Sequence, residues 1–157
     1  TILLLGLILL RLLSQNVMAQ PGSVSPFEVR LIQDSSPSPY MPLTLELFKQ
    51  QFYVSGQLLL SLEDVENARA LTDSSSGKPA FVLSVTLTPK GSRKWTEITK
   101  ANLNKRIAII VDKQLIAAPW IKSPIIGGKI PIPMFSTLAE AEKFATYIKQ
   151  SKQPKKG

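Results

Sequence analysis

Hydrophobic and polar residues alternate along parts of the chain, and this alternation predicts β-strands. The clearest case is residues 81–87, where a large apolar residue stands at every second position. Residues 107–111 form an unbroken apolar run typical of a central strand, and residues 114–118 are expected to return antiparallel after the two-residue turn at 112–113. Shorter apolar runs predict further strands at residues 27–32, 52–54 and 58–60.

Three segments carry the signals of helix starts. Residues 88–102 open with a threonine that can cap the helix and a proline at the first helical position, where its missing N–H costs nothing. Residues 137–150 open with the capping box Thr-Leu-Ala-Glu and continue with apolar residues at helical spacing. Residues 61–68 open with a serine followed by two acids, which favour the positive end of a helix.

Proline, serine and glycine mark the connections between these elements. Residues 20–26 and 34–42 are rich in proline and serine and are expected to lack regular structure, and residues 124–133 are expected to form a stiff, irregular connection. The order of strands and helices predicts an α+β fold, a mostly antiparallel sheet with two to three helices on one face. We divide the chain into a leader (1–19), an N-terminal segment with short strands (20–57), an α+β domain (58–150) and a basic disordered tail (151–157).

The leader is typical of an export signal. Residues 2–13 are apolar apart from Arg11 and are shorter than the ~20 apolar residues that cross a bilayer as a helix. They lead to Ala19, in a small-residue site of the kind that signal peptidase cuts. We expect a cleaved signal, with an uncleaved anchor as the alternative. The chain starts with threonine and has no basic leading region, so we expect its N-terminus to be truncated.

Composition narrows the possible chemistry. A length of 157 residues predicts one folded domain, and a hydrophobic content of 44% is enough to form a core. Cysteine and histidine are both absent, which excludes disulfides, zinc fingers and nucleophiles activated by histidine. The composition and pattern therefore favour a protein that is not an enzyme and holds no cofactor.

Charge is distributed unevenly along the sequence. Residues 20–88 carry 4 bases and 7 acids, whereas residues 89–157 carry 14 bases and 4 acids. A basic half of this kind indicates an anionic partner or only a well-solvated surface. The candidates for contact with an anionic partner are Lys94, Lys105 and Arg106.

Three further patterns hint at ligand or catalytic chemistry, and each has a simpler structural explanation. A metal could be held by the acids of one cluster, but these lack the spacing of a calcium loop and fit a helix N-terminus better: Glu63, Asp64, Glu66 and Asp73. Glu97 and Asp112 could be a pair of catalytic carboxylates, but surface pairing with lysine or arginine explains them. The glycines at 127–128 before a lysine lack the frame of a phosphate-binding loop.

Five short motifs follow one another between residues 58 and 150. They read LSLEDVENAR (60–69), FVLSVTLTPKG (81–91), NLNKRIAIIVD (102–112), PIIGG (124–128) and FSTLAEAE (135–142). In this order they resemble the head subdomain of the first large periplasmic domain of SecD, the membrane-embedded partner of the Sec protein-export channel. The resemblance implies an α+β head fold and contact with emerging preprotein. It implies no catalytic residues.

The chain also departs from that family. SecD continues into membrane helices after this region, whereas this sequence ends at Gly157, so we expect a stand-alone exported domain with at most a vestige of the SecD base subdomain in residues 27–57. The family usually has glycine where Lys113 stands, and a non-glycine residue at positive φ costs ~1 kcal/mol, so we expect a different type of turn. Trp120 replaces a smaller aliphatic residue, and we expect it to pack in the core, with an exposed contact to a bound peptide as the alternative.

The functional expectation is a non-catalytic, exported module that binds extended polypeptide along the edge of the 107–119 hairpin. Its predicted rim contacts are Trp120, Ile121, Pro124 and Ile125. Sec translocase components are further expected partners, in the periplasm or outside the cell. Two alternatives remain: one specific partner for a reused fold, and an anionic lipid or nucleic acid bound through residues 89–157. Export makes nucleic acid the least expected partner.

Overall fold

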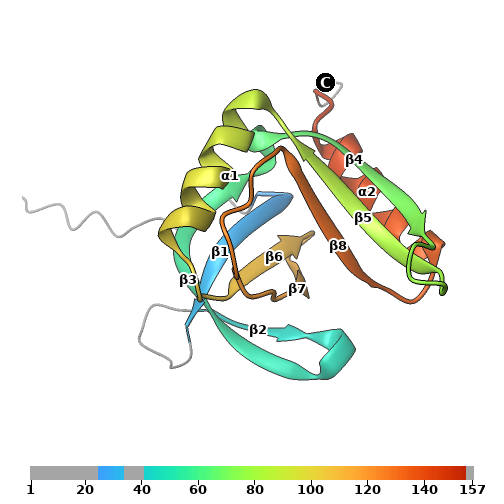
Figure 1. The fold of residues 1–157 in the computed structure, drawn as a ribbon, viewed down its shortest axis with the longest axis horizontal. Helices are drawn as coiled ribbons and strands as arrows, with labels where there is room; N and C mark the ends of the chain where they lie inside the picture. Colours follow the sequence, from blue (N-terminus) through green and yellow to red (C-terminus); the bar gives the residue numbers. More distant parts are fainter. Residues whose placement is uncertain (1–24, 34–40, 155–157) are drawn as a thin grey trace, which may run out of the picture.

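The computed structural model describes residues 25–33 and 41–154, which form two antiparallel sheets and two α-helices (Figure 1). The predicted export signal at residues 1–19 lies outside the described residues. Among the helices of the described part, none is long and apolar enough to span a bilayer.

The larger sheet has five strands, and every neighbouring pair is antiparallel. Its order is β2 (Met41–Leu45), β3 (Gln50–Ser61), β1 (Phe27–Gln33), β6 (Ile107–Val111) and β7 (Gln114–Ala117). The 3-10 turn η1 (Glu46–Phe48) forms the tip of the β2–β3 hairpin. All five residues of β6 are buried, which explains why its sequence is an unbroken apolar run.

The smaller sheet has three strands, and both α-helices pack beside it. Its order is β4 (Val65–Asp73), β5 (Ala80–Leu87) and β8 (Lys129–Phe135). Helix α2 (Leu138–Ser151) covers β4 and β5, and helix α1 (Pro89–Ala101) packs where β3, the 3-10 turn η2 (Leu62–Asp64) and β5 meet (Figure 1). The N-caps of both helices are the predicted threonines, Thr88 and Thr137.

Two apolar clusters hold these layers together. The larger one joins both sheets, α1 and α2, and its most deeply buried members include Phe27, Leu83, Trp95 and Ile148. The smaller one lies under the β2–β3 hairpin and includes Phe52. Within the described residues, the buried members of both clusters run from Phe27 to Ile148.

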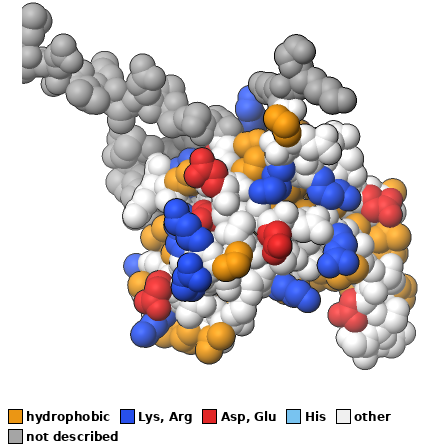
Figure 2. Space-filling view, turned by 90° about the horizontal axis from the view of Figure 1, so that it is seen from above, with side chains coloured by type: hydrophobic (Ala, Val, Ile, Leu, Met, Phe, Trp, Pro, Cys, Tyr) orange, Lys and Arg blue, Asp and Glu red, His pale blue; other side chains and the backbone are white. Residues whose placement is uncertain are grey.

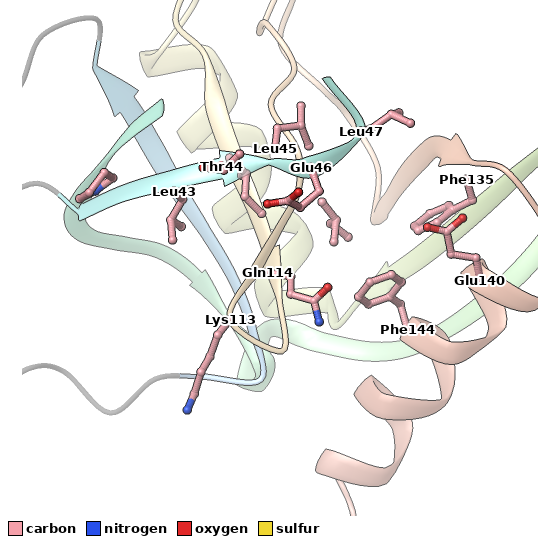
Figure 3. Close-up of a pocket in the computed structure, with 13 residues that line it drawn as sticks. Leu43, Thr44, Leu45, Glu46, Leu47, Lys113, Gln114, Phe135, Glu140 and Phe144 are labelled. Atoms are coloured by element: carbon pink, nitrogen blue, oxygen red, sulfur yellow. The ribbon is translucent and has the colours of Figure 1, made fainter. Parts of the chain in front are cut away.

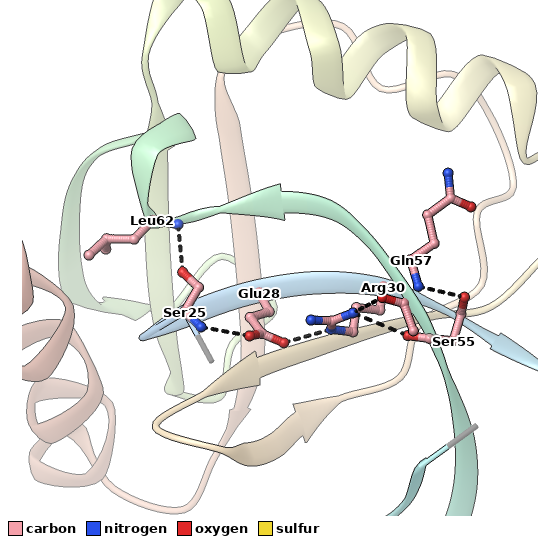
Figure 4. A network of polar contacts seen from close by, with 7 residues as sticks. Ser25, Glu28, Arg30, Ser55, Gln57 and Leu62 are labelled. Carbon is pink, nitrogen blue, oxygen red and sulfur yellow. Dashed lines mark hydrogen bonds and ion pairs between the residues drawn. The ribbon is translucent and has the colours of Figure 1, made fainter. Parts of the chain in front are cut away.

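A buried ion pair lies within β1, and its arginine also bonds to a backbone carbonyl of β3 (Figure 4). The Nε of Arg30 donates to Glu28 at 2.6 Å, and Nη1 of Arg30 donates to the carbonyl of Gly56 at 2.5 Å. Glu28 also accepts from the backbone N–H of Ser25 at 2.7 Å, and the Ser25 hydroxyl accepts from the N–H of Leu62 at 3.0 Å. Because both charges are buried, each needs the other, and the bond from Arg30 to the Gly56 carbonyl adds a side-chain contact between β1 and β3.

The α+β class is confirmed, but several predicted elements are wrong. The antiparallel strands form two sheets rather than one. The helix predicted at 61–68 is a single 3-10 turn followed by strand β4. Apolar residues there fit a helix, yet pairing with β5 along nearly the whole of β4 outweighs that local preference.

The irregular connection predicted at 124–133 is confirmed for residues 124–128 and wrong from Lys129, where β8 begins. Edge strands tolerate proline when the nitrogen faces away from the partner strand. The two strands predicted at 52–54 and 58–60 are one strand, β3, so the predicted boundary between residues 57 and 58 falls inside it. The unstructured segment predicted at 34–42 overlaps the start of β2.

The predicted C-terminal tail starts too early. Ser151 is the last residue of α2, and the Lys152 ammonium donates to the backbone carbonyl of Val65. The disordered tail predicted from residue 151 is therefore wrong at its first two residues. Residues 155–157 lie outside the described part.

Candidate functional site

Two neighbouring hollows lie between the tip of the β2–β3 hairpin and the elements β8 and α2, and β7 borders both of them; Figure 3 shows the first. The first hollow, about 570 Å³, is lined by β2 and β7 and by Phe135 and Phe144. The second hollow, about 450 Å³, is lined by Phe48, Pro131 and the end of β7. Leu45 lines both hollows, and we refer to these two neighbouring hollows together as the inter-sheet cleft.

Large apolar side chains stand exposed at the hairpin tip. Leu47 is 53% exposed and Phe48 is 60% exposed, and each lines one half of the cleft. On the opposite wall, the rings of Phe135 and Phe144 lie 5.6 Å apart, centroid to centroid. An exposed leucine and phenylalanine side by side over an apolar hollow are typical of a surface that contacts another molecule.

Three terminal strands border the inter-sheet cleft. β2 and β7 end the larger sheet, β8 ends the smaller sheet, and each is paired on one side only. β8 contains Pro131 and Pro133, and β2 contains Pro42, so each of these edges lacks an amide donor at its proline positions. β7, Gln114–Ala117, contains no proline and is the one of these three edges with every backbone donor intact.

A cationic and aromatic cluster closes one end of the cleft. The Arg106 guanidinium lies 4.5 Å from the ring centroid of buried Phe52 and 5.5 Å from that of Trp120. It also donates to the carbonyl of Ala118 at 3.0 Å, and the Lys122 ammonium lies 5.1 Å from the ring centroid of Trp120. These contacts hold the indole in place at the surface through cation–π attraction.

The structure separates the four predicted rim residues. Trp120 is 49% exposed, so the expectation that it packs in the core is wrong. Ile121 is only 2% exposed, which corrects its placement at an accessible rim: it belongs to the main core. Pro124 and Ile125 are exposed, but neither lines the cleft; Ile125 lies against α1 instead, through Thr96 and Thr99.

The predicted anionic-partner residues also occupy different environments. Lys94 donates to Asp64 at 2.8 Å, so its charge is already paired. Lys105 is exposed, and Arg106 is half-buried and packed between aromatic rings. Asp64 additionally accepts from the N–H of Ser61 at 3.0 Å, and no group of metal-binding side chains gathers around it within the described ranges.

Two ionisable groups away from the cleft show shifted pKa values. Tyr147 interacts with Asp112 through a hydrogen bond that raises the pKa of the phenol, with burial as a smaller cause. Hydrogen bonds from the backbone and side chain of Ser75 lower the pKa of Asp73. Neither residue lines the inter-sheet cleft.

Sequence reasoning missed the apolar members of the cleft. Leu47 and Phe48 stand in the run Leu-Glu-Leu-Phe, and that run carries no sign that its second leucine and its phenylalanine face solvent. Phe135 stands just before the final helix, and no pattern in the sequence marks it as part of a cleft. Only the path of the hairpin places these residues opposite one another.

Comparisons with known proteins place the fold. Residues 40–153 match the family model described as "SecDF, P1 head subdomain". The chain is 36% identical over 99 residues to protein translocase subunit SecDF of Thermus thermophilus and 35% identical over 101 residues to subunit SecD of Rickettsia typhi. These matches cover 63% and 64% of the chain but span only 13% and 19% of those relatives.

Solved structures agree with the sequence matches. The structure titled "Structure and function of a membrane component SecDF that enhances protein export" superposes with a TM-score of 0.63 at 25% identity, covering 78% of this chain and 60% of that one. The structure titled "Crystal structure of SecDF in Super-membrane-facing form" gives a TM-score of 0.64 at 25% identity, covering 78% of this chain and 18% of that one.

Proposed function

The chain belongs to the SecDF P1 head subdomain family, and from that premise we propose that it binds extended polypeptide in the inter-sheet cleft during protein export, without catalysing a reaction. The relationship makes it a domain related to protein translocation. Polypeptide is the proposed ligand, and Sec translocase components are proposed partners on the periplasmic side. The observation that carries the proposal is the exposed pair Leu47 and Phe48 over a cleft bordered by an open strand edge.

Side-chain contacts supply the first part of the binding. Apolar residues of a passing chain would cover Leu47 and Phe48 at the hairpin tip and Phe135 on the opposite wall. Burial of apolar surface is non-directional, so such contacts accept many sequences, which suits a ligand of varied composition.

Backbone pairing supplies the second part. The open edge of β7 presents donors and acceptors to an extended segment, as in other proteins that bind peptides by strand addition. Some Cα atoms of β2 and β7 lie within 8 Å of each other. A strand inserted between them needs about 9.6 Å, twice the usual strand spacing. Binding of this kind therefore moves the β2–β3 hairpin outward.

Trp120 is the predicted rim contact that best fits this role. It stands exposed beside Arg106, which lines the cleft, so an aromatic or apolar residue of the bound chain would reach its free face. Pro124 and Ile125 are assigned to a different surface below.

The test is a binding titration with a short fluorescent peptide in which valine and threonine alternate. Phe48→Ser should weaken binding by about tenfold, because the bound peptide no longer gains the ~1.5 kcal/mol or more that comes from covering an exposed phenylalanine. The matched control is Leu71→Ser, which removes an exposed apolar side chain on β4, away from the cleft. This variant should bind the peptide as the parent chain does.

A second peptide separates backbone pairing from simple apolar adhesion. The same peptide with alternate amides N-methylated keeps its side chains but loses one row of donors. Pairing with β7 predicts a large loss of affinity for this peptide. Equal binding of both peptides, or equal weakening by Phe48→Ser and Leu71→Ser, would overturn the proposed site.

A further inference from the structure

A second surface, distinct from the inter-sheet cleft, combines exposed apolar side chains with lysines. It comprises the loop of residues 119–128 and the C-terminal half of α1. Ile126 is 87% exposed and Ile125 is 36% exposed, and Leu103, just after α1, is 41% exposed. These aliphatic side chains face solvent, and no other described residue covers them.

Hydrogen bonds fix this loop against the helix, so the apolar residues project from a rigid base. The N–H of Ile125 donates to the Thr99 hydroxyl at 2.9 Å, and the Thr96 hydroxyl donates to the carbonyl of Ile125 at 3.1 Å. Further along the loop, the N–H of Asn104 donates to the carbonyl of Ile121 at 2.8 Å, and the N–H of Ile121 donates to the carbonyl of Lys105 at 2.9 Å. Leu103 therefore adjoins the same loop.

The charge of this region is strongly positive. Between Pro89 and Gly128 the sequence carries eight basic and two acidic residues. Arg93 and Lys100 lie within one turn of Thr96, the helix position that binds the loop, and both are exposed. Lys105 and Lys122 are exposed at the two segments joined by the loop hydrogen bonds. Figure 2 shows several basic side chains on the side of the molecule where α1 lies, with apolar ones among them.

We propose that this surface docks on an anionic phospholipid bilayer, with Ile125 and Ile126 entering the headgroup region and the lysines binding lipid phosphates. Aliphatic side chains on a projecting loop, ringed by lysines and beside an exposed tryptophan, match the chemistry of the interface between headgroups and acyl chains. The fit is to a surface rather than to a single headgroup, because the bases are spread along a helix and a loop. An acidic polypeptide would use the lysines but would leave Ile126 without a role.

The test is co-sedimentation with vesicles of phosphatidylcholine and phosphatidylglycerol in equal parts, using a chain that starts at Gln20. Such a chain keeps both apolar clusters and omits the apolar leader, which would bind lipid by itself. Lys100→Gln with Lys122→Gln should lower the partition coefficient about 25-fold, since one lysine at an anionic surface contributes about fivefold. The matched control is Lys143→Gln with Lys149→Gln on α2, which has the same net charge and should bind as the parent does.

The apolar part is tested by Ile126→Asp, with Leu71→Asp on β4 as its control. Ile126→Asp should lower binding by at least about tenfold, and Leu71→Asp should leave it unchanged. Trp120 fluorescence should shift to the blue on vesicles, while buried Trp95 gives a constant background.

The proposal is overturned if the α2 control weakens binding as much as the α1 and loop variant does. It is equally overturned if Ile126→Asp has no effect, or if polyglutamate binds with the same lysine dependence while the vesicles do not. Peptide binding in the inter-sheet cleft is measured without lipid, so the failure of one proposal leaves the other standing.

Discussion

Gly91, in the first turn of α1, allows the helix to touch the 3-10 turn η2, and Gly91→Ala tests whether that contact is required. A Cβ atom at this position would lie 2.3 Å from the backbone carbonyl oxygen of Asp64 and 3.0 Å from its Cβ. The same carbonyl oxygen accepts the N–H of Thr88, the N-cap residue, at 2.9 Å. The obstacle is backbone rather than a mobile side chain, so η2 or the helix has to shift.

The expected magnitude follows from three opposing effects. Overpacking costs about 1–3 kcal/mol, and loss of the Thr88 hydrogen bond costs about 1 kcal/mol. The higher helix propensity of alanine stabilises the folded state by about 1 kcal/mol and partly offsets these costs. We therefore expect the free energy of unfolding to fall by about 2 kcal/mol, and Tm to fall by roughly 8 °C for a domain of this size.

Urea denaturation followed by fluorescence and circular dichroism measures the change, because Trp95 is buried on the same helix. Gly56→Ala is the matched control: its Cβ would meet no atom within 4 Å, so it should be neutral or slightly stabilising. If Gly91→Ala proves as stable as the parent chain, the close approach of α1 to η2 is refuted.

Three further predictions concern the buried ion pair, the hairpin turn and pH. Glu28→Gln should lower the free energy of unfolding by about 3 kcal/mol in urea titrations, because Arg30 loses its partner charge. Glu28→Gln combined with Arg30→Met should recover part of that lost free energy, because no unpaired charge is then buried. If Glu28→Gln alone causes no loss, the ion pair does not stabilise the fold. Lys113→Gly should raise the free energy of unfolding by about 0.5–1 kcal/mol, because Lys113 has φ 62, whereas Gln114→Gly in β7 should lower it. The raised pKa of Tyr147 means that its contribution to stability is present below its unfolded value of 10.0 and lost as pH rises through the folded pKa. Asp112→Asn should lower that pKa in an ultraviolet titration, and an unchanged titration would refute the hydrogen bond.

The sequence predicts best those helices and strands whose boundaries depend on residues close together in the chain. Thr88 with Pro89 and Thr137 with Glu140 start helices where the chain itself provides the caps. The 107–118 hairpin was predicted correctly, but its turn was not. Asp112 and Lys113 both have positive φ, the geometry that usually selects glycine, so the expected change of turn type is wrong.

The elements that sequence missed depend on partners distant in the chain. Residues 61–68 were predicted to be a helix because Leu62, Val65 and Ala68 recur at helical spacing, yet β5 and α2 together stabilise residues from Val65 on as strand β4. Trp120 was expected in the core, but its contacts with Arg106 and Lys122 keep it at the surface. The exposure of Leu47 and Phe48 likewise follows from where the β2–β3 hairpin ends.

The central claim, that extended polypeptide occupies the inter-sheet cleft, is tested most directly by site-specific photocrosslinking. The chain contains no cysteine, so a single cysteine at Leu47 or Phe48 carries a benzophenone label without background. With an unfolded exported protein as ligand, both positions should give crosslinks, and Leu71→Cys on β4 should give almost none. Equal crosslinking at all three positions, or crosslinking only at Leu71→Cys, would contradict the claim.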